Sequence, residues 1–255
     1  MSEDMELAEY LAKGGKLTSP ANVPARYRAE LMRLMASFVD SELAGAAGFA
    51  DRINEAPGVS QRAAAARIVA EKFENAAKVL AVMGDFGADT RRYAAQHPWA
   101  ARMPRDADIG QTRQGGDMRL SVFHSPITDW TDSVVMNVLM GKASLLQIEE
   151  LARASYQPLA EVMREILAVE TRHAASGIAA LKALAGEIDG MAAIQTAYAY
   201  WHPRVAASFG AARSSRFEAL ARLGLRHTPN EALAARWQQD VADLFTDLGQ
   251  AQAAG

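Results

Sequence analysis

The chain has 255 residues, half of them hydrophobic, and its 27 basic and 30 acidic side chains leave a net charge of −3. This balance is typical of a soluble globular protein with a sizeable core, and it lacks the positive field of a general nucleic-acid binder. Because cysteine is absent, disulfides, thiolate metal sites and a cysteine nucleophile are excluded, and we expect a cytoplasmic protein without a membrane span.

Helical periodicity dominates the sequence. The expected elements, in chain order and with approximate bounds, are an N-terminal extension (about 1–23), two long helices (about 24–56 and 60–86), a connection rich in proline and glycine (about 97–127), two more long helices (about 128–153 and 155–185) and shorter C-terminal helices (about 189–250). Strand signals are nearly absent, and runs of alanine favour helix.

Four long helices with a long connection after the second match a ferritin-like bundle and its crossover. We therefore predict a single all-α domain over residues 1–255, a ferritin-like four-helix bundle with additional C-terminal helices. A plain helical array would give the same periodicity, so the pattern alone leaves both architectures open.

A Glu-x-x-His motif lies deep in the predicted fourth helix, at Glu170 and His173. Residues three apart lie about 60° apart around a helix axis, so both side chains project to one side. Di-iron bundles use this arrangement twice, with single acids from two further helices. Alone, the motif also fits a solvated face, but neighbouring Ile166 and Val169 favour an inward one. Glu42, among apolar neighbours, is the second candidate ligand, because an unpaired buried carboxylate would be costly.

Five stretches of the chain, by their order and spacing, form a wider pattern. They are Asp40-Ser-Glu42-Leu-Ala-Gly45; Gly116-Asp-Met118-Arg with Phe123, Pro126 and Trp130; Ala152-Arg-Ala-Ser155-Tyr156-x-Pro158; Glu170-x-x-His173; and Tyr200-Trp201-His-Pro203 with Phe209-Gly210. In these residues the sequence resembles the ferritin-like phenylacetyl-CoA ring epoxidases of phenylacetate catabolism, and it is most similar to their di-iron catalytic subunit. The resemblance covers about residues 24–250.

The resemblance implies six iron-ligand positions, contributed by the four bundle helices. In helix order they fall on Glu42, on Lys72 and Asn75, on Gly141, and on Glu170 and His173. Three of them keep ligand side chains (Glu42, Glu170 and His173), whereas a lysine, an asparagine and a glycine stand at the other three. The resemblance therefore predicts a degenerate di-iron site.

The register of the second bundle helix decides how degenerate the site is. A shift by one residue would place Glu71 and Glu74 at the ligand positions and leave a more metal-competent site. Periodicity favours Lys72 facing inward, because the face through Ile68, Lys72 and Ala76 is otherwise apolar, while the face through Glu71 and Glu74 is charged.

A Lys72 ammonium among the retained ligands would replace the charge of the metal. Two carboxylates, one ammonium and a protonated histidine sum to zero, and a lysine can donate but not ligate unless it is deprotonated. We therefore predict no cofactor and no pair of irons. The alternative is one iron at Glu42, Glu170 and His173, although the usual mononuclear Fe(II) triad has two histidines and one carboxylate.

Three functions follow from the resemblance. The chain is a structural subunit of a phenylacetyl-CoA-epoxidase-type oxygenase, an active monooxygenase that uses one metal on an aromatic acyl-CoA, or a free-standing helical binding protein. The expected partners are a second copy or a sibling ferritin-like subunit, with an acyl-CoA as a further candidate and neither nucleic acid nor membrane. A basic stretch could meet CoA phosphates, although such spacing more often forms a solvated face; its members are Arg213, Arg216, Arg222, Arg226 and His227.

Overall fold

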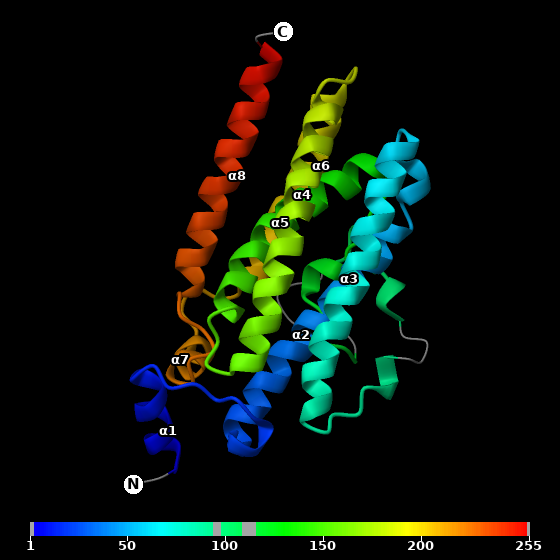
Figure 1. The fold of residues 1–255 in the computed structure, drawn as a ribbon. Coiled ribbons are helices and arrows are strands. Elements are labelled where there is room, and N and C mark those ends of the chain that lie inside the picture. The colour runs from blue at the N-terminus through cyan, green and yellow to red at the C-terminus, as the bar shows by residue number, and fades with distance from the viewer. Residues whose placement is uncertain (1–2, 94–97, 109–115, 254–255) are drawn as a thin grey trace.

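The computed structural model describes residues 3–93, 98–108 and 116–253, and its long elements are α-helices (Figure 1). They are α1 (Glu3–Ala12), α2 (Ala25–Ala50), α3 (Val59–Asp85), α4 (Trp130–Leu151), α5 (Gln157–Ala185), α6 (Gly190–Ala206), α7 (Ser215–Arg222) and α8 (Asn230–Ala253). Short 3-10 helices at Pro20–Asn22, Ile53–Glu55, Arg91–Tyr93, Pro98–Ala100, Ser121–His124 and Ala207–Phe209 lie between them. Within the described ranges none of these helices is long and apolar enough to cross a bilayer.

The four longest helices before residue 186 form the bundle. α2 packs against α3, α4 packs against α5, and α3 closes the bundle against α5. α6 and α8 pack on α4, so the C-terminal helices cover the side of the bundle that α4 presents to them (Figure 1). The prediction of an all-α, ferritin-like bundle with additional C-terminal helices is confirmed.

Two apolar clusters hold the helices together. One lies among α2, α3, α5 and the ends of α4 and α7, and it buries Tyr27 and Tyr156 completely. The other joins α4, α5, α6 and α8 around Trp201 and Trp237. Both buried indole N–H groups are satisfied, because Trp201 Nε1 donates to Asp132 Oδ1 at 2.8 Å and Trp237 Nε1 donates to the Leu139 carbonyl at 3.0 Å.

The helix bounds differ from the expected ones in two places. The sequence predicts one helix from residue 24 to residue 56, whereas α2 ends at Ala50 and a separate 3-10 turn follows at Ile53–Glu55. The N-terminal extension contains α1, which the apolar spacing does not reveal. Part of the expected connection, residues 97 and 109–115, lies outside the described residues.

The end of the connection is fastened to α2 beside the candidate site. Met118 N donates to Asp40 Oδ2 at 2.8 Å, and Leu120 N donates to Ser41 Oγ at 3.0 Å. Trp99 Nε1 also donates to Asp40 Oδ1, at 3.3 Å. These bonds satisfy buried polar groups of the two residues that precede Glu42, and they fix this part of α2 against the connection.

Candidate functional site

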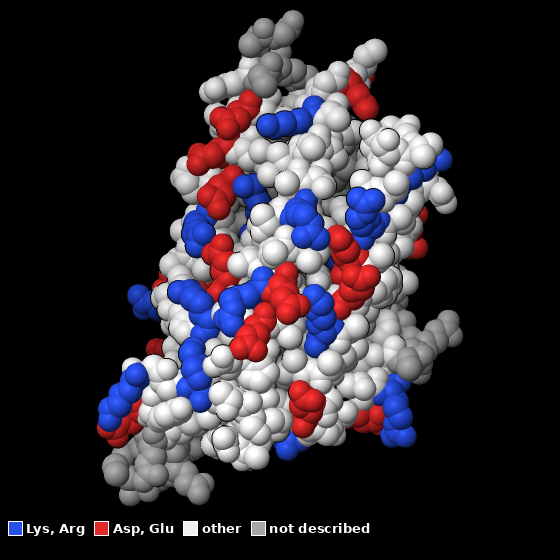
Figure 2. All heavy atoms as spheres, in the orientation of Figure 1, with Lys and Arg blue, Asp and Glu red and all other residues white. Residues whose placement is uncertain are grey.

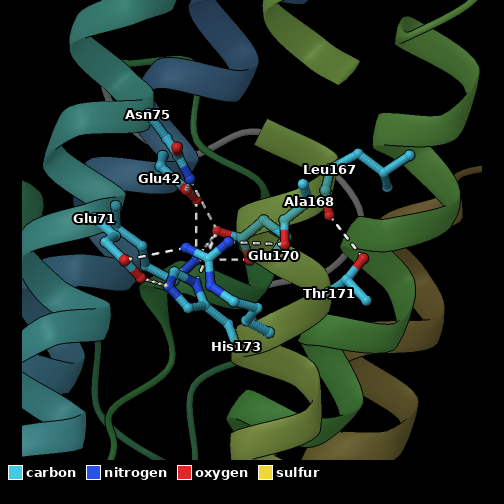
Figure 3. Close-up of polar contacts among 10 residues, drawn as sticks. Glu42, Glu71, Asn75, Leu167, Ala168, Glu170, Thr171 and His173 are labelled. Atoms are coloured by element: carbon cyan, nitrogen blue, oxygen red, sulfur yellow. Dashed lines mark hydrogen bonds and ion pairs between the residues drawn. The ribbon is translucent and has the colours of Figure 1, made fainter. Parts of the chain in front are cut away.

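Five polar side chains from three helices meet in the middle of the bundle (Figure 3). These side chains are Glu42 of α2, Lys72 and Asn75 of α3, and Glu170 and His173 of α5. All are withdrawn from solvent: the Glu170 and His173 side chains are 4% and 5% exposed, and those of Glu42 and Lys72 are 12% and 13% exposed. We call these five residues the central cluster.

Lys72 holds the two carboxylates of the central cluster together. Its Nζ donates to Glu42 Oε2 at 3.2 Å and to the two oxygens of Glu170 at 3.2 and 3.3 Å. An ammonium group has no free lone pair, so it can fill this position only as a donor. The space between the carboxylates is therefore occupied by a cation that belongs to the chain itself.

Asn75 and His173 complete the hydrogen bonds of the two carboxylates. Asn75 Nδ2 donates to Glu42 Oε1 at 3.2 Å and to Glu170 Oε1 at 3.1 Å. His173 places Nδ1 3.1 Å from Glu170 Oε1 and Nε2 2.6 Å from Glu71 Oε2. Ionised carboxylates only accept hydrogen bonds. An imidazole with a carboxylate at each ring nitrogen can therefore donate to both carboxylates only when both of its nitrogens carry a proton.

Glu71 contacts the central cluster through His173, a contact that periodicity does not predict. Its carboxylate lies at the edge of the bundle, where it contacts His173 and accepts from Arg172 Nη2 at 3.2 Å. Periodicity assigns it to a solvated face, but its side chain is only 22% exposed. Lys72 faces inward and Glu74 is exposed. This placement agrees with the favoured register, while Glu71 reaches the cluster from outside through the far nitrogen of His173.

The two inner carboxyls are both buried, but their pKa values shift in opposite directions because their charged and hydrogen-bonding partners differ. Loss of solvent raises the pKa of Glu42 to about 7, because the opposing charge of Lys72 does not fully offset burial and the neighbouring Glu170 adds to the rise. Burial also disfavours the charged form of Glu170, but Lys72 and the hydrogen bond from His173 outweigh it and lower the pKa of that carboxyl. Glu170 is thus the permanent anion of the cluster, and Glu42 titrates near neutrality.

Lys72 remains charged for the same reason. Burial alone would lower the pKa of its ammonium group, but Glu170 and Glu42 outweigh the lost solvation and raise the pKa above its usual value. At the edge of the cluster, the hydrogen bond from His173 lowers the pKa of Glu71. Inside the bundle, the charges are therefore balanced by side chains of the protein.

The family resemblance implies two irons at this position, and the donor chemistry does not fit them. Lys72 Nζ and Asn75 Nδ2 are donors that point at both carboxylates, where metal ligands would need lone pairs. Gly141, on the facing side of α4, offers no side chain. Among the residues that the structure describes, no three His, Asp or Glu side chains are arranged to hold a metal ion.

The empty space around the central cluster is small. A cavity of about 30 Å³ lies between the cluster and Gly141, with room for water but not for a substrate. A Cβ atom built on Gly141 would lie 3.9 Å from Ala174 Cβ, an ordinary van der Waals contact. The glycine is therefore not required by crowding at this point.

A larger cavity, of about 330 Å³, opens on the other side of Glu42. Its walls are mostly apolar, with Phe38, Phe123 and Leu220 among them, and Arg33, Arg216 and Arg226 add positive charge. Of the basic stretch, Arg216 and Arg226 thus line the cavity, whereas Arg213 and Arg222 do not. His227 is bound to Glu150 through its backbone N–H, at 2.6 Å.

Comparison with protein families matches residues 5–252 to the family described as phenylacetic acid catabolic protein. The match includes every residue of the central cluster. No curated protein matches the chain.

Proposed function

The chain belongs to the phenylacetic acid catabolic protein family, and we propose that it acts there as a ferritin-like subunit of an oxygenase complex without an iron centre of its own. The observation that carries this proposal is the position of Lys72, whose ammonium group bridges the two carboxylates that would otherwise bind metal. The subunit would contribute binding surface to the complex, while a sibling subunit would supply the oxidation chemistry.

The position of Lys72 also supports our assignment of the ligand positions. In that assignment Glu42, Glu170 and His173 are retained, and Lys72, Asn75 and Gly141 replace ligands. An active monooxygenase with one metal at the three retained side chains would have to expel Lys72 from between Glu42 and Glu170. That expulsion would leave a buried ammonium without partners, which is strongly unfavourable.

Metal analysis of the purified chain tests the proposal directly. Protein produced with added iron and purified without chelator should contain well under one iron per chain, measured by inductively coupled plasma mass spectrometry. Visible absorption and electron paramagnetic resonance spectra should show no iron signal. Two tightly held irons per chain would overturn the proposal and revive the Glu71 and Glu74 register.

A gain of function tests the assignment of the ligand positions. The triple variant K72E/N75H/G141D restores a ligand at each replaced position and should bind iron. Its matched control, K72E/N75H, leaves α4 without a ligand and should bind less iron, because the acid opposite Glu170 is missing. If the triple variant is folded by circular dichroism but binds no more iron than the unchanged chain, the assignment is wrong.

The cavity beside Glu42 favours a second role, the binding of an acyl-CoA or a related aromatic acid. Its volume of about 330 Å³ suits an aromatic acyl group. Arg33 and Arg216 line the cavity and share one carboxylate partner, Glu30, so together they would offer a net positive charge to such a ligand. Calorimetric titration with phenylacetyl-CoA, CoA and phenylacetate separates these ligands. R33Q should weaken binding of an anionic ligand, whereas R213Q, outside the cavity lining, should not; absence of binding by all three would refute this role.

A further inference from the structure

The outward side of α3 carries an apolar seam. Its members, alternately four and three residues apart, are Val59, Ala63, Ala66, Ala70, Phe73, Ala77, Leu80 and Gly84. This alternation is the repeat by which coiled-coil helices present apolar residues to a partner helix. We call these eight residues the α3 seam.

The α3 seam is uncovered in the part of the chain that the structure describes. Val59 is 83% exposed and Phe73 is 48% exposed, although both are large hydrophobic side chains. The four alanines and Gly84 are also exposed, and Leu80 is half-buried. α3 packs on α2 and α5 with its other sides, and it lies at one edge of the bundle (cyan in Figure 1). The seam runs for about 38 Å without a polar side chain.

Two charges flank the α3 seam in successive repeats. Arg67 and Glu74 each follow a seam residue directly, and both are exposed. Neither has an ion-pair partner among residues 3–93, 98–108 and 116–253. By contrast, Lys78 of the same helix is paired with Glu165 of α5 at 3.0 Å. On the face shown in Figure 2 the basic and acidic side chains are interspersed, so neither sign dominates it.

We infer that the α3 seam binds the α3 seam of a second copy of this chain, with the two helices antiparallel around a two-fold axis. The spacing divides the seam into two alternating sets, which are Val59, Ala66, Phe73 and Leu80, and Ala63, Ala70, Ala77 and Gly84. In an antiparallel coiled coil, each residue of one set packs on a residue of the other set in the partner. The layers are then Phe73 on the partner's Ala70, Ala77 on the partner's Ala66, Leu80 on the partner's Ala63, and Gly84 on the partner's Val59. Symmetry repeats each layer once.

Side-chain size supports this pairing over the alternatives. Three of the four kinds of layer set a large residue against alanine or glycine, and the fourth sets alanine against alanine. A parallel pairing would instead set Phe73 against itself and leave gaps at the alanine layers, which close packing disfavours. Within the chain, a Cβ on Gly84 would meet nothing within 4 Å, so the space beside this glycine is open to the partner's Val59.

Charge complementarity supports the same register. In an antiparallel pair, the residues that directly follow Ala66 and Phe73 lie beside the residues that follow the same seam positions in the partner. Arg67 therefore lies beside the partner's Glu74, and Glu74 lies beside the partner's Arg67. The interface is self-complementary in charge and shape, as a two-fold interface requires. This inference rests on the outer face of α3 and is independent of whether the central cluster holds iron.

Association is tested first by mass. Light scattering or sedimentation of the whole chain at micromolar concentration should give twice its 27.4 kDa. F73E should be monomeric, because it places a carboxylate in the central layers, and its iron content should equal that of the unchanged chain. A chain that stays monomeric when unmodified overturns the inference and leaves the seam to another partner. A dimer that persists in F73E overturns it as well.

Charge reversal then tests the register. R67E and E74R should each associate at least about tenfold more weakly, since each sets like charges together at two symmetric contacts. The double variant R67E/E74R should recover the original affinity. An equimolar mixture of the two single variants should form heterodimers, because every flanking contact in the mixed dimer is attractive. The matched control E161R reverses an exposed charge on α5 and should not change association.

Cross-linking provides a second measurement of the register. The chain has no cysteine, so introduced thiols have no competitors. Under oxidation, a mixture of A66C and A77C should give a covalent dimer, whereas either variant alone should give little. Equal yields from A66C alone and from the mixture would contradict the antiparallel register, as would unchanged association in both charge-reversed single variants.

Discussion

Replacement of Lys72 by methionine is the sharpest test of the central cluster. K72M keeps the length and apolar stem of the side chain but removes the ammonium from its contacts with Glu42 and Glu170. Removing one partner from a buried ion pair typically costs ~3–5 kcal/mol. We expect about 3 kcal/mol near neutral pH, at the lower end of that range, because Glu42 has a pKa of about 7 and can take up a proton when the lysine is lost.

The cost of K72M should increase with pH. The folded pKa of Glu42 is raised from 4.5 to about 7, so its contribution to stability is present below about pH 4.5 and is lost as the pH rises through about 7. Without Lys72 the folded pKa of Glu42 rises further, and its loss of stability continues above pH 7. The difference in unfolding free energy between K72M and the original chain should therefore widen, by up to about 1.4 kcal/mol per pH unit.

Urea unfolding followed by far-ultraviolet circular dichroism, from about pH 6 to about pH 9, measures this difference. The control is K78M, which removes a lysine of the same helix from an ion pair whose partners are 39% and 65% exposed. Such a pair contributes at most about 1 kcal/mol, and its loss should be nearly independent of pH. A cost for K72M as small as that of K78M, or a cost that does not change with pH, would refute the reasoning.

Three further substitutions probe the polar groups around the bundle. E42Q mimics the protonated carboxyl, so its unfolding free energy should lack the fall of about 3 kcal/mol that the original chain shows between about pH 5 and pH 8; a fall of equal size in both proteins would contradict the raised pKa. D132N should cost about 3 kcal/mol in urea unfolding, because it removes the buried charge that binds Arg105 and Trp201. G141A should increase the free energy of unfolding by up to about 1 kcal/mol and so raise the melting temperature, because its methyl group fits in ordinary contact. A loss of stability would show that the space beside Gly141 is needed.

Most of the fold can be predicted from the sequence because it depends on local periodicity. The bundle helices α3, α4 and α5 begin and end within two residues of the predicted bounds, since proline, glycine and the apolar spacing all act locally. The end of α2 is harder to place, because the first clear helix break in the sequence is Pro57-Gly58, whereas the helix already ends at Ala50. α1 carries only a short apolar pattern, which the residues around it do not distinguish from a loop.

The central cluster can be assembled from periodicity and resemblance, but its edge cannot. Lys72 and Glu170 lie on inward faces of two helices, and each helix reveals that face by itself. The contact of Glu71 with His173 depends on how far α3 and α5 are rotated toward one another, and no local pattern carries that information. The same holds for Asp40, whose partners belong to the distant connection.

In the proposed assignment of ligand positions, the two substituted residues of α3 change the chemistry of the site without disturbing the bundle. Lys72 and Asn75 are three residues apart on α3, so both project toward the same pair of carboxylates. Under the proposed function, an ammonium group at this position stands in for the charge of a metal, and amide hydrogen bonds stand in for its coordination, while Glu42 and Glu170 lie on α2 and α5. The hydrogen-bond network of the central cluster uses no side chain from α4, and Gly141, the residue of α4 that faces it, has none. The outer side of α3 points away from this cluster, so substitutions in the α3 seam leave the cluster unchanged. The proposals on the central cluster and on the α3 seam can therefore be tested separately, by variants on opposite sides of the same helix.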